Sequence, residues 1–423
     1  MSENGLTAAQ HKMRDAGVAE QAITVFTHYY RSLEAGATGL IPEETIEPLT
    51  QIDSLADVEV SEEAAREALS RTVLIRLNGG LGTSMGLDRA KSLLPVRDGK
   101  TFLDLLVDQV AAARRRYDVS LPLILMNSFR TREDSLEVLA GRPEIQVDGL
   151  PLDFLQNREP KLRADDLTPV EWAADPELEW CPPGHGDIYT ALLASGLLDT
   201  LLDKGYRYAM TANSDNLGAA PSARIAGWFA ASGAPYAPEM CRRTPADVKG
   251  GHLAVRKSDG RIILRDTLVE RGGILGLPLI KNSKTVDPAD SSSTPVIQLE
   301  TAMGAAVEAF EGATAIEVPR SRFLPVKTTN DLLLVRSDVY EVDDDGLLQM
   351  VPERACTVNL DPRFYKKIQD FEARFPDGVP SIKDAQTLTV EGDWTFGSGV
   401  VATGEAHVEA GGSPGRIADG ARI

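Results

Sequence analysis

A glycine-rich stretch that ends in a lysine and a serine, NGGLGTSMGLDRAKS, lies at residues 78–92. Glycine loses more chain entropy on folding than any other residue, so glycines at this density need a structural reason. One reason is an anion, because bare backbone N–H groups approach a phosphate closely and Lys91 adds a positive charge. The other reason is a tight strand-to-helix turn without a ligand, and the glycines alone do not decide between the two.

Two common phosphate-binding motifs do not fit this stretch. The dinucleotide fingerprint GxGxxG, started at Gly80, needs a glycine at position 85, where the sequence has Met85. The pattern GxxxxGK[ST] would end at the Gly-Lys-Thr of 99–101, but its first position is Leu94 instead of glycine. The sequence therefore predicts a general anion-binding turn rather than either named motif.

A second polar cluster, Asn213-Ser214-Asp215-Asn216, follows an apolar run. A carboxylate at the end of a central strand is a natural ligand for Mg²⁺, since this ion bridges to substrate phosphates through one or two carboxylates. The alternative is an Asx-type turn that caps the next segment. We predict that Asp215 binds the metal and that Asn216 makes the turn.

The stretch WCPPGHGDIY (180–189) places a histidine between two glycines. Its two prolines fix an extended approach, so the imidazole of His185 projects from a loop with small neighbours. This arrangement favours a ligand contact over a solvent-facing loop histidine. Asp187, in the same stretch, is expected to cap the following helix rather than to take part in catalysis.

Arg320, Arg322 and Lys327 gather positive charge in the stretch VPRSRFLPVKTTNDLLLVRSD (318–338). The chain as a whole is acidic, with 44 Lys and Arg against 63 Asp and Glu and a net charge of −19. Local cations in such a protein favour an anion site over a solvated basic loop. The same surplus of acid argues against a nucleic-acid partner, which normally needs clustered cations.

The hydrophobic pattern predicts the elements that position these residues. Apolar runs at 71–77, 121–127 and 206–213 alternate with helical patterns at 101–117 and 187–202. Such alternation predicts βαβ units in an α/β fold, with a mostly parallel sheet and helices on both of its faces. Ligands bind at the carboxyl ends of the strands in such sheets, which is where the glycine-rich stretch and the second polar cluster fall.

The two ends of the chain differ in character from this middle part. Residues 7–35 have apolar side chains at helical spacing and predict an N-terminal helical segment, and a further helix is expected at about 61–70. The tail 387–423 has apolar pairs separated by glycine, the turn rhythm of a short parallel β-helix, with an irregular tail as the alternative.

Composition limits the class of protein. The chain of 423 residues divides into an N-terminal helical segment (1–70), an α/β core (71–345) and a C-terminal region with the short β-helix (346–423). Its three widely spaced cysteines fit neither a disulfide framework nor a zinc motif and favour a reducing cytoplasm. The polar N-terminus and the lack of a long apolar run predict no signal peptide and no membrane partner.

Taken in order, these stretches resemble a known enzyme family, the eukaryotic-type branch of the UTP–glucose-1-phosphate uridylyltransferases. Any one stretch is a weak signal, whereas eight in register over most of the chain are a strong one. The eight are LNGGLGTSMG, the following Lys91-Ser92, WCPPGHGDIY, NSDNLGA, ADVKGG, KTVDP, QLETAMGAA and VPRSRFLPVKTTNDLLLVRSD.

The resemblance implies a Rossmann-like nucleotidyltransferase core of the glycosyltransferase-A type, followed by a small left-handed parallel β-helix that could support a homo-oligomer. It implies the reaction of UTP with α-D-glucose 1-phosphate to give UDP-glucose and pyrophosphate, with Mg²⁺ as cofactor. The resemblance implies catalysis at the phosphates by Lys91 and Lys327, metal binding by Asp215, and sugar-phosphate contacts by His185, Gly251 and Asp266. The residues implied to contact the nucleotide are Leu77, Asn78, Gly79, Gly80, Gln156, Gly184, Asn213 and Ser214. Among these, Gln156 and Gly184 are implied to recognise uracil.

The sequence departs from the family's pattern at three places. Ala90 precedes Lys91 where the family usually has proline, and the chain ends early, at Ile423, which predicts weaker oligomer contacts. Asp266 stands near the position of a glucose-contacting glutamate, and the Asn-Thr-Asn-Asn segment that touches the sugar in the family does not occur in this sequence. Two alternatives therefore stay open: a uridine-nucleotide-binding protein without catalysis, and a uridylyltransferase for another sugar 1-phosphate.

Overall fold

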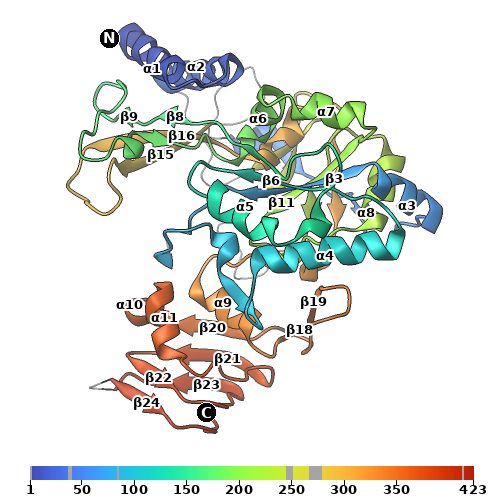
Figure 1. The fold of residues 1–423 in the computed structure, drawn as a ribbon, viewed down its shortest axis with the longest axis vertical. Helices are drawn as coiled ribbons and strands as arrows, with labels where there is room; N and C mark the ends of the chain where they lie inside the picture. The colour runs from blue at the N-terminus through green and yellow to red at the C-terminus, as the bar shows by residue number, and fades with distance from the viewer. Residues whose placement is uncertain (1, 37–40, 83–84, 244–250, 266–278, 412–413) are drawn as a thin grey trace. The chain divides into compact units, whose positions relative to one another are not determined.

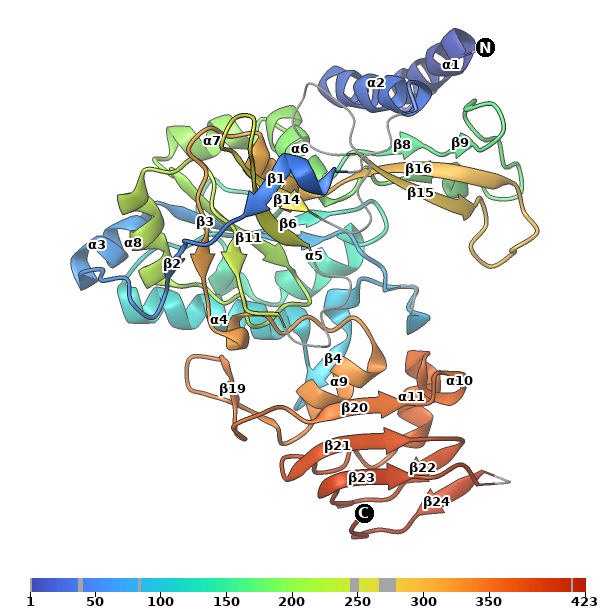
Figure 2. The same cartoon turned by 180° about the vertical axis from the view of Figure 1, so that it is seen from behind.

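The computed structural model describes residues 2–36, 41–82, 85–243, 251–265, 279–411 and 414–423 (Figures 1 and 2). The chain forms two compact units. Unit 1 comprises Met1–Arg71, Phe154–Tyr208 and Ala223–Val318, and unit 2 comprises Thr72–Asp153, Ala209–Ser222 and Pro319–Ile423. Each unit is thus assembled from segments that lie far apart in the sequence. The division into three consecutive parts, at 70 and 345, stays a prediction.

Unit 2 contains the sheet expected from the apolar runs. Strand β3 (Thr72–Asn78) is buried at every residue and pairs in parallel with β6 (Leu123–Asn127). The order of the sheet is β11-β3-β6-β7, with β11 (Tyr208–Asn213) and β7 (Asp153–Leu155) at its edges. The predicted α/β fold with parallel strands is confirmed here, and β3 and β11 end at the two predicted polar clusters.

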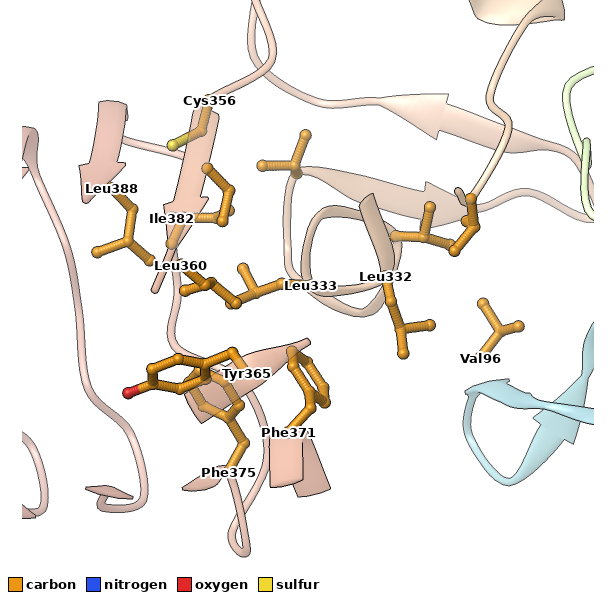
Figure 3. Packing of buried hydrophobic residues seen from close by; sticks show 14 of the residues in the cluster. Val96, Leu332, Leu333, Cys356, Leu360, Tyr365, Phe371, Phe375, Ile382 and Leu388 are labelled. Atoms are coloured by element: carbon orange, nitrogen blue, oxygen red, sulfur yellow. The ribbon is translucent and has the colours of Figure 1, made fainter. Parts of the chain in front are cut away.

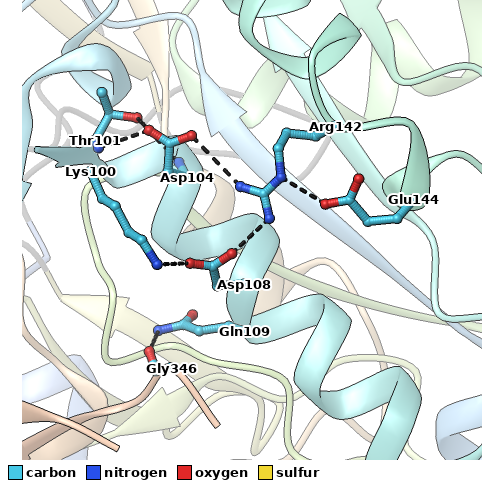
Figure 4. Close-up of polar contacts among 8 residues, drawn as sticks. All are labelled: Lys100, Thr101, Asp104, Asp108, Gln109, Arg142, Glu144 and Gly346. Atoms are coloured by element: carbon cyan, nitrogen blue, oxygen red, sulfur yellow. Dashed lines mark hydrogen bonds and ion pairs between the residues drawn. The ribbon is translucent and has the colours of Figure 1, made fainter. Parts of the chain in front are cut away.

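Helix α4 (Phe102–Tyr117) lies along this sheet (Figure 1). It begins with a capping box, in which the Thr101 side chain accepts a hydrogen bond from the Asp104 N–H and Asp104 accepts one from the Thr101 N–H. Arg142 then bridges two carboxylates one helical turn apart, 3.7 Å from Asp104 Oδ1 and 2.7 Å from Asp108 Oδ1 (Figure 4). These contacts fix the helix against the segment that follows α5 (Arg132–Ala140).

The same helix also fixes the segment after the second polar cluster. The buried Gln109 amide donates hydrogen bonds to the carbonyl of Leu217 (3.1 Å) and to that of Gly346 (3.2 Å; Figure 4). A buried amide with its donors satisfied by two distant carbonyls specifies one arrangement of all three segments.

The C-terminal part of unit 2 is a coil of parallel strands. Strand β21 (Ala385–Val390) pairs in parallel with β20 (Thr357–Leu360) on one side and β23 (Gly404–Val408) on the other. A second parallel pair joins β22 (Trp394–Phe396) to β24 (Gly415–Ile417), and Val401 forms parallel bridges with Ser381 and Arg422. Successive turns of the chain therefore stack on three faces.

An apolar cluster joins this coil to helix α9 (Thr329–Arg336) (Figure 3). Leu332 and Leu333 of α9 are fully buried between the coil and Val96 of β4 (Pro95–Arg97). The rings of Phe371 and Phe375, 4.8 Å apart at their centroids, belong to the same cluster. Because α9 begins two residues after Lys327, this packing also fixes the position of the Lys327 backbone.

Unit 1 opens with two helices instead of one continuous segment. Helices α1 (Ser2–Asp15) and α2 (Glu20–Glu34) are separated by Gly17, whose φ of +72° only glycine adopts readily. The helix predicted over 187–202 is likewise wrong as a single element, because Gly196 has a φ of +71° between α6 (Ile188–Ala194) and α7 (Leu197–Asp203).

Helices α1 and α2 cover a small antiparallel sheet, β15-β16-β9 (Figures 1 and 2). Its strands are β15 (Leu279–Thr285), β16 (Pro295–Thr301) and β9 (Leu162–Arg163). The other elements of unit 1 are α3 (Glu62–Ser70), α8 (Ala223–Ser232), β1 (Ile46–Pro48), β2 (Asp53–Ser54), β8 (Glu159–Pro160), β10 (Trp180–Cys181), β12 (Glu239–Met240), β13 (His252–Arg256), β14 (Ile262–Arg265), β17 (Ile316–Glu317) and the 3₁₀ turns η6 (His185–Asp187) and η7 (Met303–Glu308).

The remaining short elements of unit 2 are β5 (Lys100–Thr101), β18 (Tyr340–Val342), β19 (Leu348–Met350), α10 (Pro362–Tyr365), α11 (Ile368–Arg374) and the 3₁₀ turns η3 (Lys91–Leu93) and η8 (Arg320–Arg322). Among the helices described in the two units, none has the length and apolar character needed to cross a bilayer.

Candidate active site

The part of the chain that the structure describes gives no packing reason for glycine at position 80. The φ of Gly80 is not in the left-handed region, and a Cβ built there would have no atom of the described residues within 4 Å. Gly82 is different, because it has a φ of +62° and its Cβ would come within 2.8 Å of the Leu87 side chain. The turn itself therefore explains Gly82, whereas the bare backbone at Gly80 leaves room for a ligand to approach.

Replacing Gly80 with alanine is expected to raise KM for UTP at least about tenfold, because a methyl group would occupy the space that the predicted nucleotide contact requires. The free energy of unfolding should change by less than about 0.5 kcal/mol, since the site is open and φ is ordinary. Steady-state kinetics and urea unfolding measure the two effects. Gly141→Ala, at another glycine with ordinary φ, is the matched control, and an unchanged KM for Gly80→Ala would remove this turn from the nucleotide site.

Asn78 and Leu77 connect the carboxyl ends of neighbouring strands. The buried Asn78 side chain donates hydrogen bonds to Asn127 Oδ1 (2.7 Å) and Ser135 Oγ (2.8 Å). The Leu77 carbonyl accepts a hydrogen bond from the Ser214 N–H at 3.1 Å. The amide nitrogen of Asn78 is thus committed to the fold, whereas its buried Oδ1 has no hydrogen-bond partner among the described residues.

Lys91 joins the glycine-rich turn to the second polar cluster. Its backbone N–H donates to the Gly80 carbonyl at 3.2 Å. Its ammonium group forms an ion pair with Asp215, with Nζ and Oδ2 2.5 Å apart, and donates a further hydrogen bond to the Val326 carbonyl. The side chains of the pair are only 15% and 16% exposed. The ammonium and carboxylate groups are therefore partly shielded from water, which strengthens the electrostatic attraction between them.

Asn216 and Gly218 bring the segment before Lys327 to this pair. The Asn216 N–H donates to the Asn213 carbonyl in a backbone turn, but its side chain does not make the predicted Asx-type turn, because Oδ1 accepts a hydrogen bond from the distant Leu324 N–H at 2.8 Å. A Cβ on Gly218 would come within 2.4 Å of the Ser321 carbonyl oxygen, so only glycine permits this approach. The backbone next to Lys327 therefore lies beside Asp215, whose carbonyl accepts from the Val326 N–H.

The three cations of the basic stretch have different surroundings. The Arg322 guanidinium donates to the Ala220 carbonyl, and the Arg320 guanidinium lies over the Phe323 ring at 5.1 Å from its centroid. The Lys327 side chain is exposed, with Nζ 6.0 Å from the centre of the same ring. Arg322 thus serves the fold of this stretch, and Lys327 is the cation with most freedom to meet a substrate.

The glycines on either side of His185 are explained by packing within unit 1. Gly184 has a φ of +80°, and a Cβ there would come within 2.5 Å of the Thr301 carbonyl oxygen. A Cβ on Gly186 would come within 2.4 Å of Thr301 Oγ1. The Thr301 N–H in turn donates to the Pro183 carbonyl at 2.9 Å, so the turn and strand β16 fit backbone to backbone.

This packing sets the tautomer of His185. Its Nδ1 accepts a hydrogen bond from the Met303 N–H at 2.9 Å, which leaves the ring proton on Nε2. Desolvation by the surrounding protein lowers the pKa of His185, although part of the side chain is exposed, so the ring is neutral near pH 7. The Tyr189 and Tyr236 hydroxyls both donate to the Met303 carbonyl, which holds that peptide in place.

The prediction that Asp187 caps the following helix is wrong. Its side chain makes no capping bond; Oδ2 accepts from the Asn157 N–H at 2.6 Å and Oδ1 from the Asn157 side-chain amide at 2.8 Å. The reason is that η6 continues directly into α6, so the carboxylate turns inward. Burial raises the pKa of Asp187 to about 7, against the opposing effect of the Asn157 hydrogen bonds.

The stability of the protein should therefore depend on the ionisation of Asp187. Because its pKa in the folded protein is about 7 against 3.8 for the free side chain, the folded state binds the extra proton and is favoured below about pH 4, and this advantage is lost as the pH rises to 7. Asp187→Asn should become more stable relative to wild type by a few kcal/mol between pH 4 and pH 7. Urea unfolding at both pH values measures this, and a constant difference would contradict the shifted pKa.

The remaining predicted residues are less informative. Gln156 is buried in unit 1 just after β7, Asn213 is exposed at the end of β11, and a Cβ on Gly251 would come within 2.9 Å of the Leu264 side chain. Asp266 lies outside the described residues. Of the predicted site residues in unit 2, the structure brings together Leu77, Asn78, Gly80, Lys91, Ser214, Asp215 and the backbone before Lys327.

Sequence reasoning missed Asn127, Thr301 and Met303, which support the site. Asn127 ends β6 directly opposite Asn78, so two asparagines at the ends of adjacent apolar runs were a usable signal. Thr301 and Met303 lie within the quoted QLETAMGAA stretch, but their roles are carried largely by backbone groups, which no side-chain pattern reveals.

With this geometry in place, comparison with known proteins decides the family. A family model described as UTP–glucose-1-phosphate uridylyltransferase matches residues 23–271 and 263–402. The chain belongs to this family.

Other members of the uridylyltransferase family resemble the chain over most of its length. A UTP–glucose-1-phosphate uridylyltransferase of Solanum tuberosum is 38% identical over 403 residues, which cover 86% of this chain and 82% of that protein. The enzyme of the same name from Hordeum vulgare is 37% identical, covering 86% and 83%.

Solved structures of the uridylyltransferase family have the same fold. A point mutant of UDP-glucose pyrophosphorylase from Leishmania major, in complex with UDP-glucose, superposes with a TM-score of 0.91 at 39% identity and covers 99% of this chain and 98% of that one. A UDP-glucose phosphorylase from Trypanosoma brucei gives 0.90 at 37% identity, with the same coverage.

Proposed function

We propose that this chain transfers the uridylyl group of UTP to α-D-glucose 1-phosphate, giving UDP-glucose and pyrophosphate. The observation that carries the proposal is the position of Lys91, which is hydrogen-bonded to the open Gly80 turn through its backbone and ion-paired to Asp215 through its side chain. A bare backbone, a lysine and a carboxylate at one edge of an α/β sheet are what a nucleoside triphosphate and its metal need. Family membership supports the same reaction.

The residues suit a reaction that needs no activated nucleophile. The phosphate oxygen of the sugar is already an anion near pH 7, so no serine, cysteine or general base has to take a proton from it. The site must instead hold two anions in line and offset the charge that builds on the α-phosphate and the leaving pyrophosphate. We assign this charge neutralisation to Lys91 and Lys327.

His185 suits binding of the sugar phosphate in this scheme. Its Nδ1 is occupied by the Met303 N–H, so Nε2 carries a hydrogen that it donates to an anion. A neutral ring makes this contact without taking the proton of the phosphate. We assign His185 to orientation of the acceptor phosphate rather than to acid–base chemistry.

Asp215 fits the predicted role of Mg²⁺ ligand. Its Oδ2 is held by Lys91, while its buried Oδ1 has no hydrogen-bond partner among the described residues and is available to a cation. Mg²⁺ typically takes only one or two protein carboxylates and fills its other positions with substrate phosphates and water. When bound, the ion would neutralise charge on the phosphates, and Asp215 would hold it.

Release of pyrophosphate tests the proposal. Purified protein supplied with UTP, glucose 1-phosphate and Mg²⁺ is expected to release pyrophosphate in a coupled assay, faster than with N-acetylhexosamine 1-phosphates. A higher rate with another sugar 1-phosphate would change the acceptor but keep the reaction class. No turnover by folded protein with any of these acceptors would contradict the proposal.

A second candidate, a uridine-nucleotide-binding protein without turnover, has a specific observation in its favour. The sequence has no Asn-Thr-Asn-Asn run, and the two stretches that the family model matches overlap at residues 263–271, around Asp266. Calorimetry that detects UTP binding to a protein with no pyrophosphate release would favour this candidate.

We further propose that the parallel coil at the C-terminus is a short left-handed β-helix, that it is the surface for any homo-oligomer, and that the protein acts in the cytoplasm. The stacked pairs β20-β21-β23 and β22-β24 support the first of these, and the small number and wide spacing of the three cysteines support the last.

A further inference from the structure

A pocket of about 280 Å³ lies within unit 1, between helix α2 and the segments that carry η6, α6 and η7. Its lining includes Gly186 and Asp187 but not Gln156, Gly184 or His185, the residues assigned to uracil and the sugar phosphate. The pocket therefore touches the histidine turn without using the residues of the proposed substrate site. Its volume suits a small ligand, at the lower limit of typical ligand pockets.

Most of the lining is apolar. Val25 and Phe26 of α2 line one side, and Leu299 of β16, Ala306 of η7 and Phe310 line the other. Phe310 is held by a stacked contact with Tyr236, with ring centroids 6.0 Å apart and an angle of 12° between the planes. Such walls favour a flat or aliphatic body that avoids water.

Two buried carboxyl groups interrupt this apolar surface. Glu159 and Asp187 both line the pocket and are only 4% and 5% exposed. Glu159 Oε1 has no hydrogen-bond partner among the described residues, while both oxygens of Asp187 accept hydrogen bonds from Asn157. A buried carboxylate oxygen without a partner is costly and needs an explanation, which a bound donor supplies.

The surroundings of Glu159 favour a positively charged donor. Burial, followed by the negative charges of Asp187 and Glu300, raises the pKa of Glu159 well above its ordinary value. Arg158 also lines the pocket, but its guanidinium stacks over the Trp180 ring, 4.6 Å from the centroid. A raised pKa favours the neutral acid, so a bound ammonium group would offset the cost of ionising Glu159 and Asp187 in this buried place.

We propose that this pocket is a binding site for a small hydrophobic amine, with its apolar body between α2 and η7 and its ammonium group on Glu159 and Asp187. The pocket shares Gly186 and Asp187 with the turn that carries His185, so a ligand bound in the pocket changes the affinity of the substrate site for its substrates. This second part rests on the proposed function, whereas binding itself does not.

The first test uses 2-phenylethylamine as the probe and its neutral analogue 2-phenylethanol for comparison, in a ligand-observed NMR titration at pH 7. The amine is expected to bind at least about tenfold more tightly than the alcohol. Glu159→Gln should abolish that preference and leave binding of the alcohol unchanged. Glu177→Gln, which removes an exposed carboxylate of the same unit, should change neither.

Equal affinities for the amine and the alcohol, or an undiminished preference in folded Glu159→Gln, would overturn the site. The second test measures KM for UTP with the pocket saturated by the amine, and a change of at least about twofold is expected in wild type but not in Glu159→Gln. Binding with no change in KM would overturn the link to the turn. Binding of the amine to protein that has no turnover would leave the site standing while the proposed function fails.

Discussion

Replacing Lys91 with alanine is expected to lower kcat by about 10²–10³-fold, because it removes a positive charge directed at the phosphates in the transition state. The same change should lower the free energy of unfolding by about 1–3 kcal/mol, since it leaves Asp215 Oδ2 and the Val326 carbonyl without the ammonium group in a partly buried site where Oδ1 has no partner among the described residues. Pyrophosphate release under saturating substrate and urea unfolding measure the two effects separately.

The matched control for Lys91 is Lys100→Ala. Lys100 forms a similar ion pair with Asp108 at 2.8 Å, but its side chain is 53% exposed and lies on the capping network of α4 (Figure 4). Exposed pairs contribute little, so this variant should keep both kcat and stability close to wild type. Equal losses of kcat in Lys91→Ala and Lys100→Ala would show that Lys91 has no specific role in the reaction.

Replacing Lys327 with alanine is expected to lower kcat by about 10²–10³-fold with almost no change in stability. The side chain is exposed, and the nearby backbone is fixed independently, because the Lys327 N–H donates to Asp331 in the cap of α9. Comparison with Lys91→Ala therefore distinguishes Lys327, whose charge is expected to affect only the reaction, from Lys91, whose charge is expected to affect both the reaction and the stability of the fold.

Steady-state kinetics for Lys327→Ala should show the loss in kcat rather than in KM for UTP, because the proposed mechanism directs this group at the reacting phosphates. Lys383→Ala removes an exposed lysine elsewhere in unit 2 and serves as its control. An unchanged kcat for Lys327→Ala would remove this residue from the mechanism and leave Lys91 as the principal cation.

The sequence predicted the elements with strong periodicity and the position of the glycine-rich stretch and of the second polar cluster at strand ends. The helical pattern at 101–117 and the mostly apolar run at 71–77 specify their elements locally, and α4 and β3 form there as expected. The breaks at Gly17 and Gly196 were missed because glycine within a helical pattern is compatible with either continuation or a turn, and tertiary packing decides which.

Roles that depend on contacts between distant segments could not be predicted in the same way. Asp187 was predicted to cap a helix, but its carboxylate instead accepts hydrogen bonds from Asn157, which is 30 residues away in the sequence and comes close only in the folded chain. Lys91 and Asp215, which are 124 residues apart, were each assigned separately to phosphate and metal. Their direct ion pair is a property of the fold that spacing alone does not contain.

The central claim is that the Gly80 turn, Lys91 and Asp215 form one cradle for the triphosphate of UTP and its metal. A crystal structure of the protein with a non-hydrolysable UTP analogue and Mn²⁺, a substitute for Mg²⁺ with a measurable anomalous signal, tests it most directly. We predict an anomalous peak within bonding distance of Asp215 Oδ1 and phosphate oxygens next to the Gly80 backbone and Lys91 Nζ. A triphosphate bound elsewhere, with Lys91 still paired to Asp215 and no metal on Oδ1, would contradict the claim.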